Sequence, residues 1–298
     1  MNNLGLIDIG GTSIKFAIWR NNELEKLPAV STPDNLEEFY QILTNMVNKM
    51  KRETGIVGVG ISSPGAVNKA TGVVEGTSAV TYLHDFDILS SLTKRFGLPV
   101  SMENDANCAA LAELEAGAGK HADSLIFLIL GTGVGGSVIV NHQIWHGAHL
   151  FGGEFGFMLV EDYKTLSKLG TAVNAASRYN ASHGTSYSGK EIFELAKSGN
   201  IDAEQEVRTM YQALARGIFN LQYSFDPELV VIGGAVSNNP DLIPAIEEEI
   251  ENIRDEITIA SIKPKLVTCK FTDGANLRGA AVDFYQTFNT KQSVEKHV

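Results

Sequence analysis

The sequence predicts an α/β protein built from two similar halves, and three observations support this prediction. LIDIGGTSIKFAIW (residues 6–19) reads as a strand, a glycine turn and a returning strand, and FLILGTGVGGSVIV (127–140) repeats that order. VGVGISSPG (57–65) and LVVIGGAVS (229–237) also correspond, since each is a strand that ends in a loop of small residues. Two α/β halves that each open with a hairpin indicate the actin-like (ribonuclease-H-like) architecture, with two lobes and a central ligand cleft.

The elements follow from local patterns taken in chain order. Strands are expected at residues 4–9, 14–19 and 56–61, with an amphipathic helix before the third strand and Asp34 as its cap. A helix is expected at 202–224, and an insertion of the second half at roughly 145–200. The alternative is a doubly wound α/β domain, but its strands alternate with helices and do not open with hairpins.

Composition limits the partners and the compartment. The chain has 298 residues, 44% of them hydrophobic, and a net charge of −11, which disfavours nucleic acid and anionic membranes as partners. Two cysteines without metal-ligand spacing predict neither a disulfide framework nor a cysteine zinc site, and they suit a reducing cytoplasm. No signal peptide or membrane span is apparent, so a cytoplasmic protein is expected.

The glycine turns are candidate phosphate loops. In the first turn the backbone N–H groups of Gly10 and Gly11 can point at a phosphate. Asp8 ends a buried strand, where a carboxylate is costly, so Mg²⁺ held through water is the expected reason for it. Lys15 on the return strand can add a charge-assisted contact. A tight hairpin turn with no ligand is the structural alternative.

The second turn, GTGVGG, strengthens the phosphate interpretation because it occupies the matching place in the second half. Thr132 and Gly133 are expected to grip a polyphosphate opposite the first turn. A strand follows GTGVGG where a dinucleotide fingerprint needs a helix, so the dinucleotide interpretation fails. Gly233 and Gly234, with the later GANLRGAA (274–281), are expected to form a floor for the nucleotide base. The full set of predicted ATP-binding residues is Asp8, Gly10, Gly11, Thr12, Lys15, Thr132, Gly133, Gly233 and Gly234.

Residues 103–107, ENDAN, place carboxylates and amides where a strand meets an alanine-rich helix. Asp105 could simply cap that helix, but capping does not explain Glu103 and Asn104 or the polar loop SSPG at 62–65. Hydroxyl, amide and carboxylate groups around one cavity are suited to a sugar. One carboxylate in a phosphate-gripping cleft can accept the proton of an attacking hydroxyl, as an Asp does in kinases.

DIGGT, ENDAN, GTGVGG and GGEFG (152–156) together resemble the ROK family (repressor, open reading frame, kinase), in family order and over essentially the whole chain. The resemblance implies ATP-dependent phosphorylation of a hexose, usually at its 6-hydroxyl, with Asp105 as the base. It also implies a homodimer and a return of the last helix to the first lobe. The expected lobes are residues 1–118 plus 276–298, and 119–275. The implied sugar contacts come from Ser63, Gly65, Asn104, Asp105 and Glu154.

The chain departs from the family pattern in its zinc and sugar motifs. Phe157 stands where the family has a histidine, and Val173 stands where it has a glutamate. Because no cysteine lies between residues 109 and 268, no zinc is expected, and His146 and His149 are the only candidate ligands left. The insertion must then hold by its own packing, with Phe151, Phe155 and Phe157 as expected core residues.

Phe157 also bears on the substrate. In the family, the missing histidine and glutamate help to read hydroxyls at the anomeric end of the sugar. An apolar wall there tolerates a substituent, and Phe157 can stack on a second sugar, as in the β-glucoside kinases of the family, which phosphorylate disaccharides such as cellobiose. Glucose or N-acetylmannosamine is the alternative acceptor. A sugar-responsive repressor or a non-catalytic actin-like nucleotide-binding protein is the alternative of another class. The first phosphate loop begins at Asp8, so no preceding DNA-binding segment is expected, and ENDAN with SSPG argues against a protein without a sugar pocket.

Overall fold

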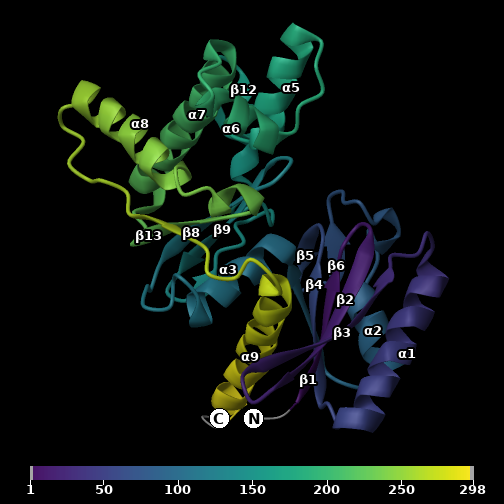
Figure 1. Cartoon of the computed structure of the whole chain (residues 1–298). Coiled ribbons are helices and arrows are strands. Elements are labelled where there is room, and N and C mark those ends of the chain that lie inside the picture. Colours follow the sequence, from purple (N-terminus) through teal and green to yellow (C-terminus); the bar gives the residue numbers. More distant parts are fainter. Residues whose placement is uncertain (1–2, 296–298) are drawn as a thin grey trace. The chain divides into compact units, whose positions relative to one another are not determined.

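The computed structural model describes residues 3–295, with side chains up to residue 288, and the chain forms two compact units. The first unit comprises the described residues up to Ala116, the segment Ala148–Phe151 and the described residues from Asp273 onward. The second unit comprises Gly117–Gly147 and Gly152–Thr272. Both contain a five-stranded sheet, and Figure 1 shows the elements of each.

The two sheets have the same topology. The first has the order β3-β2-β1-β4-β7 and the second β10-β9-β8-β13-β14, each with two antiparallel pairs followed by two parallel pairs. This repetition confirms the two similar halves and the actin-like architecture. The first sheet consists of β1 (Leu4–Ile9), β2 (Ser13–Arg20), β3 (Glu23–Ser31), β4 (Gly58–Ser63) and β7 (Val100–Asn104). The second consists of β8 (Leu125–Leu130), β9 (Val134–Val140), β10 (Gln143–Ile144), β13 (Leu229–Gly233) and β14 (Leu266–Thr268).

Helices cover both faces of the first sheet. The alternation of side chains along β1 separates two apolar clusters. Ile7 packs with α1 (Leu36–Thr54) and α2 (Ile88–Phe96), whereas Leu6 packs with α3 (Asp105–Ala116) and α9 (Ala275–Glu295). Asp8 shares the α3–α9 face with Leu6, and this alternation is what directs it toward the start of α3. The remaining elements of the unit are β5 (Ala66–Asn68), β6 (Val73–Glu75) and the short helix η1 (Thr81–Leu83).

One capping prediction was wrong. Asn35, and not Asp34, caps α1, because the Asn35 side chain accepts the backbone N–H of Glu38. Either residue type is a favoured cap, so the sequence alone did not separate them.

Helices α7 (Ile201–Phe225) and α8 (Leu242–Glu256) pack their apolar faces on the second sheet. A second apolar cluster joins α5 (Ala172–His183) and α6 (Gly189–Lys197) to α7. The insertion adds η2 (Phe155–Phe157), β11 (Leu159–Glu161), β12 (Lys164–Thr165) and α4 (Leu166–Leu169), and η3 (Ala235–Asn238) follows β13. No helix within residues 3–295 is long and apolar enough to cross a lipid bilayer.

The expected core of the insertion was only partly right. Phe155 is buried, but Phe151 is 55% exposed and Phe157 is 70% exposed. A single turn of η2 can direct only one of its aromatic rings inward, and Phe155 takes that place against Phe225. Leu166 and Leu169 of α4 supply the rest of the buried apolar surface in this part of the insertion.

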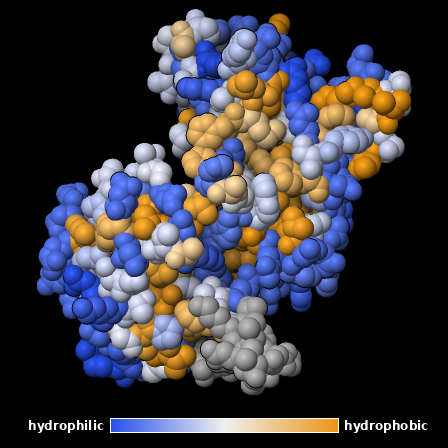
Figure 2. Space-filling view, turned by 180° about the vertical axis from the view of Figure 1, so that it is seen from behind, coloured by the Kyte–Doolittle hydropathy of each residue, from blue (hydrophilic) through white to orange (hydrophobic). Residues whose placement is uncertain are grey.

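The segment after α8 exposes several apolar side chains. Ile257, Ile259 and Ile262 are 43%, 90% and 38% exposed. Figure 2 shows hydrophobic residues gathered at this end of the second unit. Clustered exposed apolar residues are typical of surfaces that contact another molecule.

Candidate active site

The turn between β1 and β2 is closed by its own backbone. The Gly10 N–H donates to the Ser13 carbonyl at 3.0 Å, and a Cβ on Gly10 would lie 2.8 Å from that oxygen. The glycine is therefore needed for the turn, where its N–H bonds to Ser13, and its predicted phosphate contact stays a prediction. Gly11 and Thr12 are exposed at the tip and remain candidates for phosphate contact.

Asp8 is 6% exposed at the end of β1 and is surrounded by donors. Its Oδ1 accepts from the Ser62 hydroxyl at 2.9 Å and from the Asn276 side-chain amide at 3.0 Å. The Lys15 ammonium lies 3.5 Å from Oδ2. These three donors account for the burial of the carboxylate, so burial alone does not require a metal ion. Ser62 and Asn276 were not among the predicted site residues.

Asn104 caps α3, and Asp105 does not. The Asn104 Oδ1 accepts the backbone N–H groups of Ala106 at 2.9 Å and Asn107 at 3.2 Å. Its Nδ2 donates to the carbonyl of Gly65 at 3.1 Å, which joins the SSPG loop to ENDAN. Asn104 therefore holds the cap position, and the Asp105 carboxylate accepts only the N–H of the next residue, Ala106, at 2.8 Å.

The environment of Asp105 shifts its proton affinity. Burial raises the pKa of its carboxyl, and the nearby Asp8 carboxylate acts in the same direction against the Ala106 N–H. A carboxylate with a raised pKa is a stronger base than a solvated one, which suits proton abstraction. Asp8 and Asp105 are neighbours although 97 positions separate them, because β1 and β7 flank β4 in one sheet.

The SSPG loop is partly buried: Ser62 and Ser63 are buried, and Pro64 and Gly65 are half-buried. Ser63 is fully buried, and its hydroxyl donates to the Pro64 carbonyl at 3.2 Å. Gly65 has φ of +90°, and a Cβ there would lie 2.8 Å from the Val74 side chain. Gly65 thus permits the close approach that places its carbonyl on Asn104. The sugar contacts of Ser63 and Gly65 stay predictions.

The second turn is held by the start of α5. The Gly131 N–H donates to the Gly133 carbonyl at 3.0 Å, and Thr132 is exposed at the tip. Asn174 donates to the Thr132 carbonyl at 3.1 Å and to the Ser167 carbonyl at 2.8 Å. Because the Asn174 amide bonds to one carbonyl in the turn (Thr132) and one in α4 (Ser167), it fixes the position of the turn relative to α4.

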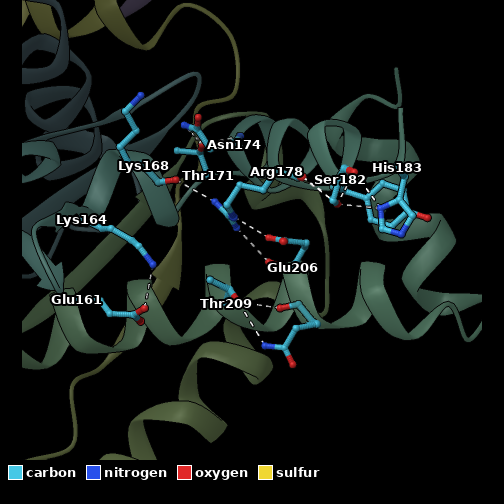
Figure 3. A network of polar contacts seen from close by, with 12 residues as sticks. Glu161, Lys164, Lys168, Thr171, Asn174, Arg178, Ser182, His183, Glu206 and Thr209 are labelled. Atoms are coloured by element: carbon cyan, nitrogen blue, oxygen red, sulfur yellow. Dashed lines mark hydrogen bonds and ion pairs between the residues drawn. The ribbon is translucent and has the colours of Figure 1, made fainter. Parts of the chain in front are cut away.

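An ion pair anchors α5 in turn. Arg178 pairs with Glu206 of α7 at 2.6 Å and donates to the Lys168 carbonyl at 2.9 Å (Figure 3). Asn174 lies about one helical turn before Arg178 on α5, and the cap residue Thr171 lies about two turns before it (Figure 3). The second turn is therefore supported by α4, α5 and α7 together.

The glycines of GGEFG allow close packing against β9. A Cβ on Gly153 would lie 2.6 Å from the Gly136 carbonyl, and one on Gly156 would lie 2.2 Å from the Val134 carbonyl. This packing leaves Glu154 and Phe157 on the surface of the second unit. A surface place is what a sugar contact requires, whereas the core role expected for Phe157 was wrong.

Gly233 and Gly234 lie where β13 enters η3. Gly234 has φ of +96°, and a Cβ there would lie 2.2 Å from the Leu130 carbonyl. A cavity of about 530 Å³ begins at the next residue and is mainly apolar. Its walls come from α5, α6 and η3, through Ala172, Val173, Lys190, Phe193, Val236 and Asn238. The sequence did not indicate this cavity, because its walls come from three separate segments.

The segment GANLRGAA was expected to help form a floor for the nucleotide base, but the contacts it makes in the structure are of another kind. It begins α9, where Asn276 bonds Asp8 and Gly279 packs against the backbone of Cys108. These two contacts lie within the first unit, and a role of the segment toward a nucleotide base stays a prediction.

The predicted residues thus fall into two groups. The first unit brings together Asp8, Lys15, Gly65, Asn104 and Asp105, and the second carries Thr132, Gly133, Glu154, Phe157, Gly233 and Gly234. Among the described side chains, no three of His, Cys, Asp or Glu gather closely enough to hold a metal ion.

Comparisons with known proteins identify the family. The family model described as "ROK family" matches residues 4–286. The chain is 31% identical to a β-glucoside kinase of Listeria monocytogenes, over 96% of this chain and 98% of that protein. It is 32% identical to an N-acetyl-D-glucosamine kinase of Haemophilus influenzae, over 93% and 98%.

A solved structure gives the same result. A ROK family protein of Streptococcus pneumoniae in complex with sucrose superposes with a TM-score of 0.88 at 35% identity, covering 97% of this chain and 99% of that one. The chain belongs to the ROK family, and it is an ATP-dependent sugar kinase of that family.

Proposed function

We propose that this kinase transfers the γ-phosphoryl group of ATP to the 6-hydroxyl of a β-glucoside, with Asp105 as the general base. The observation that carries the assignment is the state of Asp105: it begins α3 next to the cap residue Asn104 and has a raised pKa beside Asp8. Its Oδ1 accepts one backbone N–H, from Ala106, so its second oxygen is the one proposed to accept the proton.

The chemistry follows from the position of that carboxylate. Asp105 accepts the proton of the 6-hydroxyl as the alcohol oxygen bonds to the γ-phosphorus, and the bond to the β-phosphate oxygen breaks to release ADP. Asn104 has a second amide hydrogen beyond the one given to Gly65, and this hydrogen can orient the sugar. Positioning and charge stabilisation carry most of the catalysis in phosphoryl transfer.

The nucleotide is assigned to the glycine turns and the cavity. The tips at Gly11–Thr12 and Thr132–Gly133 offer backbone N–H groups and hydroxyls to phosphate oxygens. The cavity after Gly234 has a volume of about 530 Å³, within the range of small-molecule sites, and its apolar walls suit a purine base.

Magnesium is part of this proposal. Asp8 fits an ion held through water, because within residues 3–295 its Oδ2 contacts only the Lys15 ammonium, at 3.5 Å, while Ser62 and Asn276 bond to Oδ1. Bound Mg²⁺ supplies charge neutralisation on the phosphate oxygens of ATP. The residues of this chain hold and orient the phosphates around it.

The hydrogen bonds of Asn174 to the second turn yield a prediction. Replacing Asn174 with Ala removes its bonds to the Thr132 and Ser167 carbonyls, worth about 1 kcal/mol each, so the KM for ATP should rise about tenfold or more. The KM for the sugar should stay the same. Steady-state kinetics with each substrate varied in turn measures both.

Asn180 gives the matched control for this variant. It lies on the same helix and donates to the Tyr187 carbonyl, away from the turn. Asn180→Ala should lower thermal stability without raising the KM for ATP. An equal rise of the KM for ATP in both variants would contradict the proposal that Asn174 positions the second turn.

The acceptor is proposed from the apolar substitution at Phe157. Phe157 is 70% exposed and therefore available on the surface of the second unit where the family pattern has His, whereas Val173 lines the cavity assigned to the nucleotide base. Phe157 cannot demand a free anomeric hydroxyl, and its phenyl face can stack on a second sugar ring. The similarity to the β-glucoside kinase of L. monocytogenes supports a β-glucoside as the acceptor. The similarity to the N-acetyl-D-glucosamine kinase of H. influenzae supports a monosaccharide.

A coupled ADP-release assay over a sugar panel separates these acceptors. We expect cellobiose to have a higher kcat/KM than glucose, N-acetylglucosamine and N-acetylmannosamine, with phosphate mapped to the 6-position of the non-reducing glucose. Selective use of a free monosaccharide, with cellobiose inert, would refute the β-glucoside assignment while leaving the kinase assignment intact.

Two further properties belong to the proposal. We expect a homodimer, which is consistent with the exposed isoleucines after α8, and light scattering at micromolar concentration should report twice the chain mass. Cys108 is buried and Cys269 is half-buried, and we expect both thiols to stay reduced in a cytoplasmic protein.

A further inference from the structure

Lys69 lies between two carboxylates from different parts of the first unit. Its ammonium is 2.7 Å from Glu103 Oε2 on β7, and it also pairs with Asp283 Oδ1 on α9. The side chains of Glu103 and Asp283 are 1% and 2% exposed, whereas Lys69 is 34% exposed. The contact ties the turn after β5 to the strand that leads into ENDAN.

Glu103 contacts the opposite side of this cluster with its other oxygen. Its Oε1 accepts the backbone N–H of Asn104 at 2.8 Å and the Asn107 side-chain amide at 2.9 Å. One carboxylate therefore connects Lys69 to Asn104, immediately before Asp105, and to Asn107, two residues after it. No residue of this connection contacts a ligand in the proposed reaction, apart from Asn104.

The charges explain why Lys69 is needed. Two carboxylates buried together repel each other and lose hydration, unless a cation compensates them. Burial raises the pKa of Asp283, and Glu103 acts in the same direction, while Lys69 opposes both. Burial lowers the pKa of Lys69, but Glu103 and Asp283 outweigh that effect and the net shift is upward, so Lys69 stays charged.

We propose that Lys69, anchored by Asp283, is a positioning residue that fixes Asp105 by holding Glu103 in place. The proposal rests on the proposed role of Asp105 in sugar phosphorylation. Without Lys69, Glu103 must take up a proton or rotate toward solvent, and either change weakens its bonds to Asn104 and Asn107. The first turn of α3 then shifts, and Asp105 shifts with it.

Kinetics of three variants test this role. Lys69→Met should lower kcat about 10²-fold, the cost of a displacement near 1 Å at a reacting group, and leave the KM for ATP unchanged. Lys69→Arg should retain most of the activity, because a guanidinium can bridge two carboxylates. Lys51→Met is the control: Lys51 donates to the Phe96 carbonyl at 2.9 Å, at the end of α2 and before β7 begins, whereas ENDAN lies at the other end of β7, and the loss of Lys51 should leave kcat unchanged.

Amide hydrogen exchange gives a readout that does not depend on activity. In Lys69→Met the peptide covering residues 103–116 should exchange faster, while the peptide covering β8 should not change. Normal exchange and normal kcat in Lys69→Met would overturn the proposal, as would equal losses in Lys69→Met and Lys51→Met. If the wild-type chain phosphorylates no sugar, the proposed function fails, and exchange alone still decides whether Lys69 orders ENDAN.

Discussion

Asp105→Asn should lower kcat about 10³-fold and leave sugar binding nearly unchanged. The amide has the shape of the carboxylate and its oxygen can still accept the Ala106 N–H, but it cannot take the proton of the 6-hydroxyl. Coupled ADP release gives kcat, and calorimetry with the sugar gives the dissociation constant. A variant with full velocity would refute Asp105 as the base.

The raised pKa of Asp105 also sets the acid limb of activity. As pH falls through that pKa, the carboxyl becomes protonated and kcat/KM should fall tenfold for each further pH unit. The apparent pKa of this acid limb should therefore lie above the ordinary pKa of an aspartate. The residual activity of Asp105→Asn should show no such fall at acid pH.

The same shift has a consequence for stability. Because the folded pKa lies above the unfolded pKa, the folded chain binds this proton more tightly, and stability falls as pH rises through the interval between the two values. At neutral pH Asp105 is thus a destabilising group, and Asp105→Asn should raise the melting temperature. Loss of activity together with a gain of stability would distinguish a catalytic role from a structural one.

Asp87 is the control with the opposite sign. The hydrogen bonds from Ser90 lower the pKa of its carboxyl, which caps α2, so its stabilisation is present above the unfolded pKa and is lost on acidification. Asp87→Asn should lower the melting temperature slightly at neutral pH, because Asn also caps helices. Its kcat should equal that of the wild type.

The fold could be predicted because its signals are local. Each hairpin is formed by one short run of consecutive residues, 6–19 and 127–140, and the same order of hairpin and buried strand occurs twice. The choice between neighbouring caps was beyond this reasoning: at α1 Asp34 was named and not Asn35, and at α3 the cap is Asn104, which the sequence reasoning did not consider for that role. Capping depends on backbone angles that adjacent polar residues do not reveal.

The site was predicted less completely because its supports are distant in sequence. Asn276 meets Asp8 across 268 positions, and Asp283 meets Lys69 across 214. No periodicity links such pairs. Phe157 shows the same limit, since whether one ring of a short turn points inward depends on the strand it faces.

Gly279→Ala should destabilise the first unit by about 3 kcal/mol or more. A Cβ there would lie 1.7 Å from the Cys108 carbonyl oxygen and 2.6 Å from the Cys108 Cα, so α9 and α3 would have to separate by roughly 1 Å. Alanine improves helix propensity by only about 1 kcal/mol, so the steric cost prevails. Because α3 carries Asp105, kcat should fall as well.

Gly217→Ala separates the steric cost from a general effect of the substitution. Gly217 also lies inside a helix, α7, but its Cβ would meet only the Leu166 side chain at 3.1 Å, which can adjust. That variant should change stability by no more than about 1 kcal/mol. The chain has two tryptophans, Trp19 in the first unit and Trp145 in the second, so urea unfolding in a Trp145→Phe background reports on the first unit alone. An unshifted Trp19 transition in Gly279→Ala would mean that the two helices do not need this close approach, and the placement of Asp105 by α9 packing would then be wrong.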